Sequence, residues 1–205
     1  GEISAIRIRQ DLINDVIRKG TISDEALEVL QAQARAVAVA IQHAVTDEAL
    51  GILRDHARTA ADILRHDTIP RAVIDHLVTQ ADLIAGTIRG GVFDQETRKV
   101  LADRLADLRV LWRDGAPKPN DIKAIQAQVD LARAALVDGV VRPKELNAIK
   151  QQIALVRDAY ADGVITNSEI QEIRNSTTRY VNELARTPNA IDKVTASIAS
   201  AIARL

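Results

Sequence analysis

The stretch "ADGVITNSE", residues 161–169, has the residue types that connect one helix to the next. Gly163 suits the left-handed conformation found just after the end of a helix. Thr166 is a good N-cap, and Glu169, three residues later, completes a capping box with it. This stretch therefore predicts that one helix ends near Gly163 and that the next begins after Thr166.

Related connections recur along the chain at a fixed interval. Glycines lie 24 residues apart at Gly91, Gly115, Gly139 and Gly163. The same step backward and forward gives Gly20, His43 (one residue short), Asp67 and Thr187. We call these eight residues the anchors and count positions from them. A period in the range of 20 to 50 residues is typical of repeat proteins.

Apolar residues fall at constant positions after each anchor. Position 7 is Leu27, Leu50, Ile74, Ile122, Leu146, Ile170 and Val194, with Arg98 as the exception. Positions 10, 14, 17 and 21 are also mostly apolar, and steps of three and four are typical of a helix that buries one face. A second apolar stripe, at positions 9, 16 and 20, indicates that each helix contacts neighbours on two sides.

These patterns predict an all-α fold with one helix in each 24-residue repeat, about nine helices in total. The short links between the helices require successive helices to be antiparallel. The predicted architecture is an antiparallel helical repeat array, either an α-solenoid or an elongated multi-helix bundle. We expect one helical-repeat domain over residues 1–205. Because the pattern begins and ends within a repeat, we also expect a fragment of a longer protein.

Position 13 interrupts the apolar pattern near the middle of each predicted helix. It is occupied by Gln33, His56, Gln80, Arg104, Gln128, Gln152 and Ser176. One interpretation is a semi-exposed or hydrogen-bonded layer that fixes the register between helices. The alternative is a ladder of side chains that recognises a partner. The burial of these side chains distinguishes the two interpretations.

The Asp–Gly turns also resemble the second half of a calcium-binding EF-hand loop and the acidic turns of small tellurite-resistance-type domains. In the EF-hand interpretation, Asp158, Asp162 and Glu169 would be ligands. Tyr160 stands at the third loop position and offers no carboxylate. We therefore predict no metal site, with Asp158, Asp162 and Glu169 as the alternative ligand set.

The histidines His43, His56, His66 and His76 all lie within one third of the chain. They occupy four different positions of the repeat, and no two of them have the i, i+4 spacing of a helical metal-binding motif. We expect these side chains to lie at helix ends or in solvent.

Composition and motifs argue against several functional classes. Cysteine is absent, which excludes disulfides and thiolate sites, and only one Trp, two Tyr and one Phe are available for stacking. The net charge of -1 lacks the basic excess of a nucleic-acid binder, and no apolar run is long enough to cross a membrane. The chain has neither a nucleophile elbow nor a glycine-rich phosphate loop. We therefore expect no enzyme activity, no cofactor and no small-molecule substrate.

The remaining hypothesis is a non-catalytic spacer, scaffold or protein-docking segment of a larger protein. Its partner would be another protein or a second copy of this chain. The absence of cysteine favours a secreted, cell-surface or virion protein without fixing the compartment. The alternative is a calcium-responsive helical domain that uses the Asp–Gly turns.

Overall fold

The computed structural model describes residues 23–43, 46–113 and 116–186, together with Arg7, Gln10, Asp11, Ile13 and Asn14. Within these residues it contains seven helices and no strand. The helices are α2 (Asp24–Gln42), α3 (Asp47–Ile63), α4 (Arg71–Arg89), α5 (Gln95–Leu111), α6 (Pro119–Ala135), α7 (Pro143–Ala159) and α8 (Asn167–Arg186). The all-α prediction is thus confirmed for the described residues. The predicted last helix, and most of the first, lie outside them.

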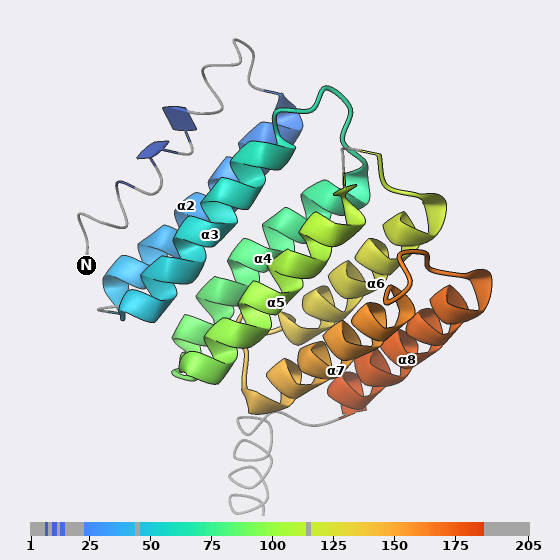
Figure 1. Cartoon of the computed structure of the whole chain (residues 1–205). Coiled ribbons are helices and arrows are strands. Elements are labelled where there is room, and N and C mark those ends of the chain that lie inside the picture. Colours follow the sequence, from blue (N-terminus) through green and yellow to red (C-terminus); the bar gives the residue numbers. More distant parts are fainter. Residues whose placement is uncertain are drawn as a thin grey trace, which may run out of the picture.

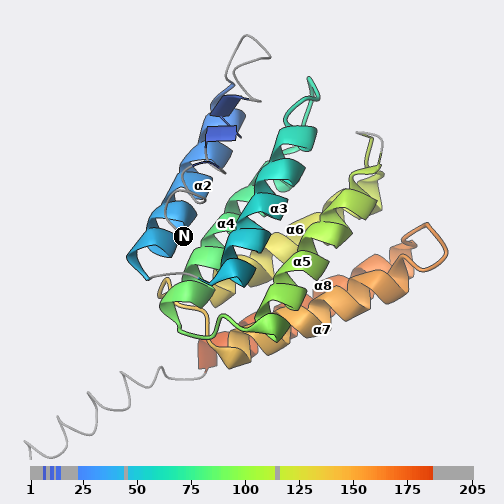
Figure 2. The same cartoon turned by 60° about the vertical axis from the view of Figure 1, so that its left-hand side comes forward.

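The helices lie in two layers (Figures 1 and 2). One layer consists of α2, α4, α6 and α8, and the other of α3, α5 and α7. Each helix packs against its neighbours within the layer and against the helices that precede and follow it in the chain. Successive helices run in opposite directions through short connections (Figure 1).

Because the layers alternate, contacts between neighbouring helices of the same layer can repeat every 48 residues. Arg109 of α5 donates to Thr59 Oγ1 of α3 over 3.0 Å. Arg157 of α7 donates to Asp107 Oδ1 of α5 over 2.9 Å. Both residues of the second pair lie 48 positions after those of the first. The structural unit is therefore a pair of helices.

One apolar core runs through all seven helices, from Ala26 to Tyr180. Both predicted stripes contribute to it, for example Leu50 at position 7 and Leu83 at position 16. Leu27, also at position 7, is wrongly predicted to be buried because 46% of its surface is exposed. Among the described helices, α2 packs mainly on α3 and α4. The face of α2 that carries Leu27 has no neighbour among these helices.

The start of α8 matches the predicted turn chemistry. The Thr166 backbone N–H donates to Glu169 Oε2 over 2.8 Å, and the Glu169 N–H donates to Thr166 Oγ1 over 3.3 Å. These two bonds form the predicted capping box. Helices α6 and α7 begin with proline, at Pro119 and Pro143, which suits the first helical position because no N–H is needed there.

The three anchor glycines within the described residues adopt the left-handed conformation, but their places relative to the helices differ. The φ angles of Gly91, Gly139 and Gly163 are 65°, 74° and 87°. Gly91 immediately follows the C-cap of α4, and the N–H of Val92 donates to the Thr87 carbonyl, which completes a Schellman motif. Helix α7 already ends at Ala159, so the prediction that Gly163 ends it is wrong. The Gly163 N–H instead closes an additional turn by donating to the Tyr160 carbonyl over 2.9 Å.

Candidate functional site

Two of the three carboxylates of the alternative calcium site, those of Asp162 and Glu169, hydrogen-bond to residues between α7 and α8. Asp162 Oδ1 accepts the Val164 N–H over 3.1 Å. Glu169 Oε2 accepts both the N–H and the hydroxyl of Thr166, over 2.8 and 2.7 Å. Asp158 and Asp162 are exposed. In the part of the chain that the structure describes, no three acidic or histidine side chains are grouped so that they could hold a metal ion.

The histidines divide into an exposed pair and a buried pair. His43 caps the end of α2 and His66 lies in the connection after α3, both exposed as expected. The expectation is wrong for His56 in α3 and His76 in α4, which are completely buried. Hydrogen bonds replace water at both rings: His56 Nε2 lies 2.9 Å from the Leu77 carbonyl oxygen, and His76 Nε2 lies 2.9 Å from Gln128 Oε1.

Burial decides the interpretation of position 13. Gln33, His56, Gln80, Arg104, Gln128 and Gln152 are each at most 1% exposed, and only Ser176 is partly exposed. We call these buried residues the mid-helix layer. Side chains enclosed in this way do not form a ladder on the surface, so the hydrogen-bonded layer is the correct interpretation.

The mid-helix layer joins consecutive helices by a repeated bond. A side chain at position 13 donates to the backbone carbonyl at position 10 of the next helix. The bonds are Gln33 Nε2 to Leu53 at 3.2 Å, His56 Nε2 to Leu77 at 2.9 Å, and Gln80 Nε2 to Leu101 at 2.9 Å. Sliding one helix along its neighbour would leave these buried donors without acceptors, so the layer fixes the register.

Arg104 places a positive charge inside this layer. Its guanidinium donates to Gln80 Oε1 over 2.7 Å and to Thr79 Oγ1 over 3.1 Å. It also reaches the backbone carbonyls of His76 and Gln128, at 3.4 and 3.3 Å. Burial lowers the pKa of Arg104 to about 9, and the negative charge of Asp107 opposes that change. Arg104 therefore remains charged at neutral pH and is held by neutral acceptors on α4 and α6.

A second chain of bonds links the layer to the surface. His76 Nε2 donates to Gln128 Oε1, and Gln128 Nε2 donates to Asp107 Oδ2 over 3.1 Å. Arg157, which is partly exposed, donates to Asp107 Oδ1 over 2.9 Å. Burial raises the pKa of Asp107 to about 6 despite these donors.

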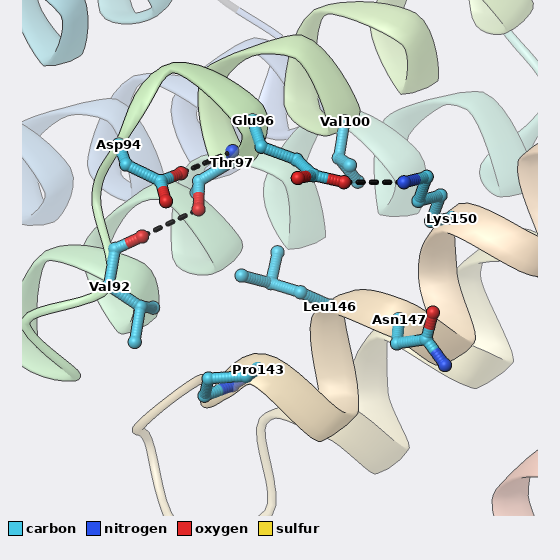
Figure 3. Close-up of a pocket in the computed structure, with 9 residues that line it drawn as sticks. All are labelled: Val92, Asp94, Glu96, Thr97, Val100, Pro143, Leu146, Asn147 and Lys150. Carbon is cyan, nitrogen blue, oxygen red and sulfur yellow. Dashed lines mark hydrogen bonds and ion pairs between the residues drawn. The ribbon is translucent and has the colours of Figure 1, made fainter.

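Two cavities open between α5 and α7, and we call this interface the α5–α7 seam. The N-terminal cavity has a volume of about 360 Å³ and lies near the first turns of both helices (Figure 3). Its lining residues are Val92, Asp94, Glu96, Thr97, Val100, Pro143, Leu146, Asn147 and Lys150. The C-terminal cavity has a volume of about 220 Å³. Its lining residues are Ala106, Asp107, Val110, Leu111, Val156, Arg157 and Tyr160.

The seam departs from the repeat where its lining is compared with the α3–α5 interface. Leu146 corresponds to Arg98, which lies 48 residues earlier. The Arg98 guanidinium reaches across to α3, where it lies 3.6 Å from the place a Cβ of Gly51 would take. Ala106 of the C-terminal cavity likewise corresponds to the longer Arg58. At these two places the α5–α7 seam has smaller side chains than the preceding interface, whereas Thr97 and Lys150 are larger than their counterparts, Ala49 and Ala102.

The charges along the seam are largely paired within the seam itself. Glu96 forms an ion pair with Lys150 across the N-terminal cavity (Figure 3). Arg157 pairs with Asp103 over 3.0 Å as well as with Asp107. The hydroxyl of Thr97 donates to the Val92 carbonyl. Between these paired groups the lining is mostly aliphatic, with Asn147 and Tyr160 among the exceptions, and Val110 is 40% exposed. Such a lining offers apolar surface to the apolar side chains of a ligand.

The sequence analysis did not identify the α5–α7 seam as a site. A signal was present, because Arg98 is the exception at position 7 whereas Leu146 follows the pattern. Arg98 and Leu146 are recognised as equivalent only when each helix pair is compared with the next one, 48 residues later. That comparison requires knowing which helices share a layer.

None of the described helices has both the length and the apolar character needed to cross a membrane. Comparison of the chain with models of protein families, with curated protein sequences and with solved structures finds no match.

Proposed function

We propose that this chain is a non-catalytic helical-repeat scaffold, of the solenoid type, that docks a partner protein in the α5–α7 seam. The observation that supports docking most directly is the pair of cavities, each of which is lined at one position, Leu146 or Ala106, by a shorter side chain than the preceding helix pair has there. A scaffold with a binding surface needs repeats that pack in the same way along the array and one interface whose side chains differ from the repeat.

The occupant that suits the seam is an amphipathic helix of the partner. The seam lies between helices and offers no sheet edge, so a peptide that satisfies its own backbone groups is favoured. Val100 lines one cavity and Val110 the other, which separates the cavities by about 15 Å along α5. Two aliphatic side chains about three turns apart on the partner helix would match this separation. Since Glu96 and Asp103 already have cationic partners, the contact face of that helix is expected to be uncharged.

The test fills the cavities with the residues that the chain has at the equivalent places. In Leu146→Arg and Ala106→Arg, each new side chain matches the one found 48 residues earlier. The control is Ala154→Arg, at an exposed position of α7 outside both cavities. A photo-crosslinking residue at position 147 is used in living cells to capture the partner, and the captured segment is then synthesised as a peptide.

We expect this peptide to be amphipathic and helical, and to bind the parent chain and the Ala154→Arg variant equally. Filling either cavity is expected to weaken binding at least tenfold while the far-UV circular dichroism stays the same. Equal binding by all four proteins, or capture of a segment with a charged contact face, would refute the proposed site.

The calcium-responsive alternative makes a separate prediction about the connection between α7 and α8. If Asp158, Asp162 and Glu169 bind calcium, millimolar calcium should raise the melting temperature, and Glu169→Gln should abolish the rise. We expect no rise, because Glu169 Oε2 already accepts two hydrogen bonds from Thr166. Calorimetric titration with calcium chloride provides the second measurement.

A further inference from the structure

The mid-helix layer and the groups bonded to it bury four ionisable side chains, three of which lie outside both cavities of the α5–α7 seam; the fourth, Asp107, also lines the C-terminal cavity. His56 of α3, His76 of α4, and Arg104 and Asp107 of α5 are between 0% and 5% exposed. Each of them hydrogen-bonds to a neighbouring helix. A change in their charge therefore acts directly on the contacts that join the helices.

His76 has room for one proton only. Its Nε2 must carry that proton, because the partner atom, Gln128 Oε1, is an acceptor. Its Nδ1 is buried and has no hydrogen-bond partner among the described residues. Burial lowers the pKa of His76 well below its usual value, and the positive charge of Arg104 lowers it further. A second proton would create an unpaired donor close to a buried cation.

His56 differs from His76 because both of its ring nitrogens face oxygen atoms. One faces the Leu77 carbonyl and the other Gln33 Oε1, so a second proton would find an acceptor. Burial nevertheless lowers the pKa of His56 to about 4, and the charge of Arg104 acts in the same direction. The cost of a second cation inside the layer exceeds the gain from one hydrogen bond.

Among the groups around the two histidines, the carboxylate that acts on Arg104 is that of Asp107 on α5. Arg157 of α7, which is partly exposed, forms an ion pair with Asp107. The residues of α2 and α6 that contact the rings are the neutral Gln33 and Gln128. The layer and the groups bonded to it thus contain one cation, Arg104, one anion, Asp107, and two neutral imidazoles at neutral pH.

We propose that His56 and His76 form an acid-sensitive latch, which holds α3 and α6 against α4 at neutral pH and releases them when mild acid protonates the two rings. His56 makes the bond from α3 to α4, and His76 makes the bond from α4 to α6. Asp107 moderates the response. The two histidines lie outside both cavities of the α5–α7 seam, so the latch does not rest on docking there, although Asp107 lines the C-terminal cavity.

The direction of the pH dependence follows from the pKa shifts. The folded-state pKa values of both histidines are lowered from 6.5, so the stability they provide is complete above pH 6.5 and is lost as the pH falls below it. The folded-state pKa of Asp107 is raised from 3.8 to about 6, so the folded chain holds a proton that the unfolded chain lacks between these values. Near pH 5 unfolding therefore takes up about two protons at the histidines and releases about one from Asp107, a net uptake of about one.

Urea unfolding at a series of pH values between 7.5 and 4.5 measures this uptake. His56→Gln places at position 13 the residue found there in four other repeats, with a donor for the Leu77 carbonyl. His76→Gln retains a donor for Gln128. We expect each substitution to reduce the net uptake near pH 5 by about one proton, and Asp107→Asn to increase it by about one. The control variants are His43→Gln and His66→Gln, at exposed positions.

Hydrogen exchange distinguishes a latch from general acid unfolding. After correction for the intrinsic rate, amides of α3 and α4 in the parent chain are expected to open about tenfold more often for each pH unit between 6 and 5. Amides of α7 are expected to respond less, and His56→Gln should suppress the response of α3. An uptake that is unchanged in both buried-histidine variants, or equal acceleration of α3 and α7 in every variant, would overturn the proposal.

Discussion

Val141 crosses the last turn of α4 so closely that two positions there have no space for a side chain. Its N–H donates to the Gly86 carbonyl over 3.0 Å. A Cβ on Gly90 would lie 2.2 Å from the Val141 carbonyl oxygen, and a Cβ on Gly86 would lie 2.8 Å from Val141 Cγ2. The connection between α6 and α7 is therefore held against α4, and glycine is required for close approach rather than for a left-handed backbone.

Gly90→Ala is expected to lower the free energy of unfolding by about 1–3 kcal/mol, because the methyl group must displace backbone. The matched control is Gly51→Ala in α3, where the nearest atoms belong to the flexible Arg98 side chain at 3.6 Å or more. Alanine inside a helix is favoured over glycine, so this control should gain up to about 1 kcal/mol. Urea titrations of both variants provide the comparison, and a loss of stability in Gly51→Ala as large as that in Gly90→Ala would contradict the argument.

At the scale of the helix, three successive helices begin with the same backbone bond. The carboxylates of Asp121, Glu145 and Glu169 accept the N–H three residues earlier, at 2.9, 3.0 and 2.8 Å. The three carboxylates lie 24 residues apart, so the period of the sequence is also a period of helix starts. Only Thr166 also offers a hydroxyl that accepts the N–H of its own carboxylate residue.

Thr166→Ala is expected to lower the free energy of unfolding by about 1 kcal/mol, because α8 loses its N-cap. The control is Thr178→Ala at an exposed position of the same helix, where the change should stay within about 0.5 kcal/mol. Chemical denaturation gives both values, and circular dichroism reports any loss of helix. Equal effects of the two substitutions would show that the N-cap does not stabilise α8.

The helices could be predicted from the sequence because their signals are local. The pairing of helices could not be predicted, because it depends on residues far apart in the chain. Pro119, Pro143 and Thr166 mark helix starts through the chemistry of a few adjacent residues. The 24-residue period says nothing about which helices share a layer, because it treats every helix alike. That arrangement depends on contacts such as Arg109 with Thr59, 50 residues apart in the chain.

The functional features show the same division. A polar residue at position 13 was evident, but its burial was not, because Gln33 and Arg104 can be buried only when other helices supply acceptors. His76 was placed in solvent or at a helix end for the same reason, since its partner Gln128 lies 52 residues away. The seam required knowledge that Leu146 and Arg98 occupy equivalent places in successive helix pairs.

At the scale of the whole molecule, the contacts connect near neighbours along two layers. Among the described helices α2 packs on α3 and α4, and α8 packs on α6 and α7. Ion pairs follow the same order within a layer: Arg35 of α2 pairs with Asp82 of α4, and Arg133 of α6 pairs with Asp75 of α4. In the solenoid that we propose, the array would grow by translation, and an added pair of helices would find the same neighbours as the pair before it.

Duplicating residues 71–118, a unit of 48 residues that contains α4 and α5, tests this arrangement. If the array is a solenoid, the inserted pair adds one helix to each layer, and the maximum dimension from small-angle scattering should grow by about 9 Å.

The matched control duplicates residues 95–118 only, a unit of 24 residues that contains α5. This insertion would move every later helix into the opposite layer, so position 13 and the apolar stripes would meet the wrong neighbours. We expect the longer insertion to unfold cooperatively with at least the parent's stability, and the shorter one to lose stability. An unchanged maximum dimension after the longer insertion, or equal stability of the two insertions, would contradict growth by helix pairs.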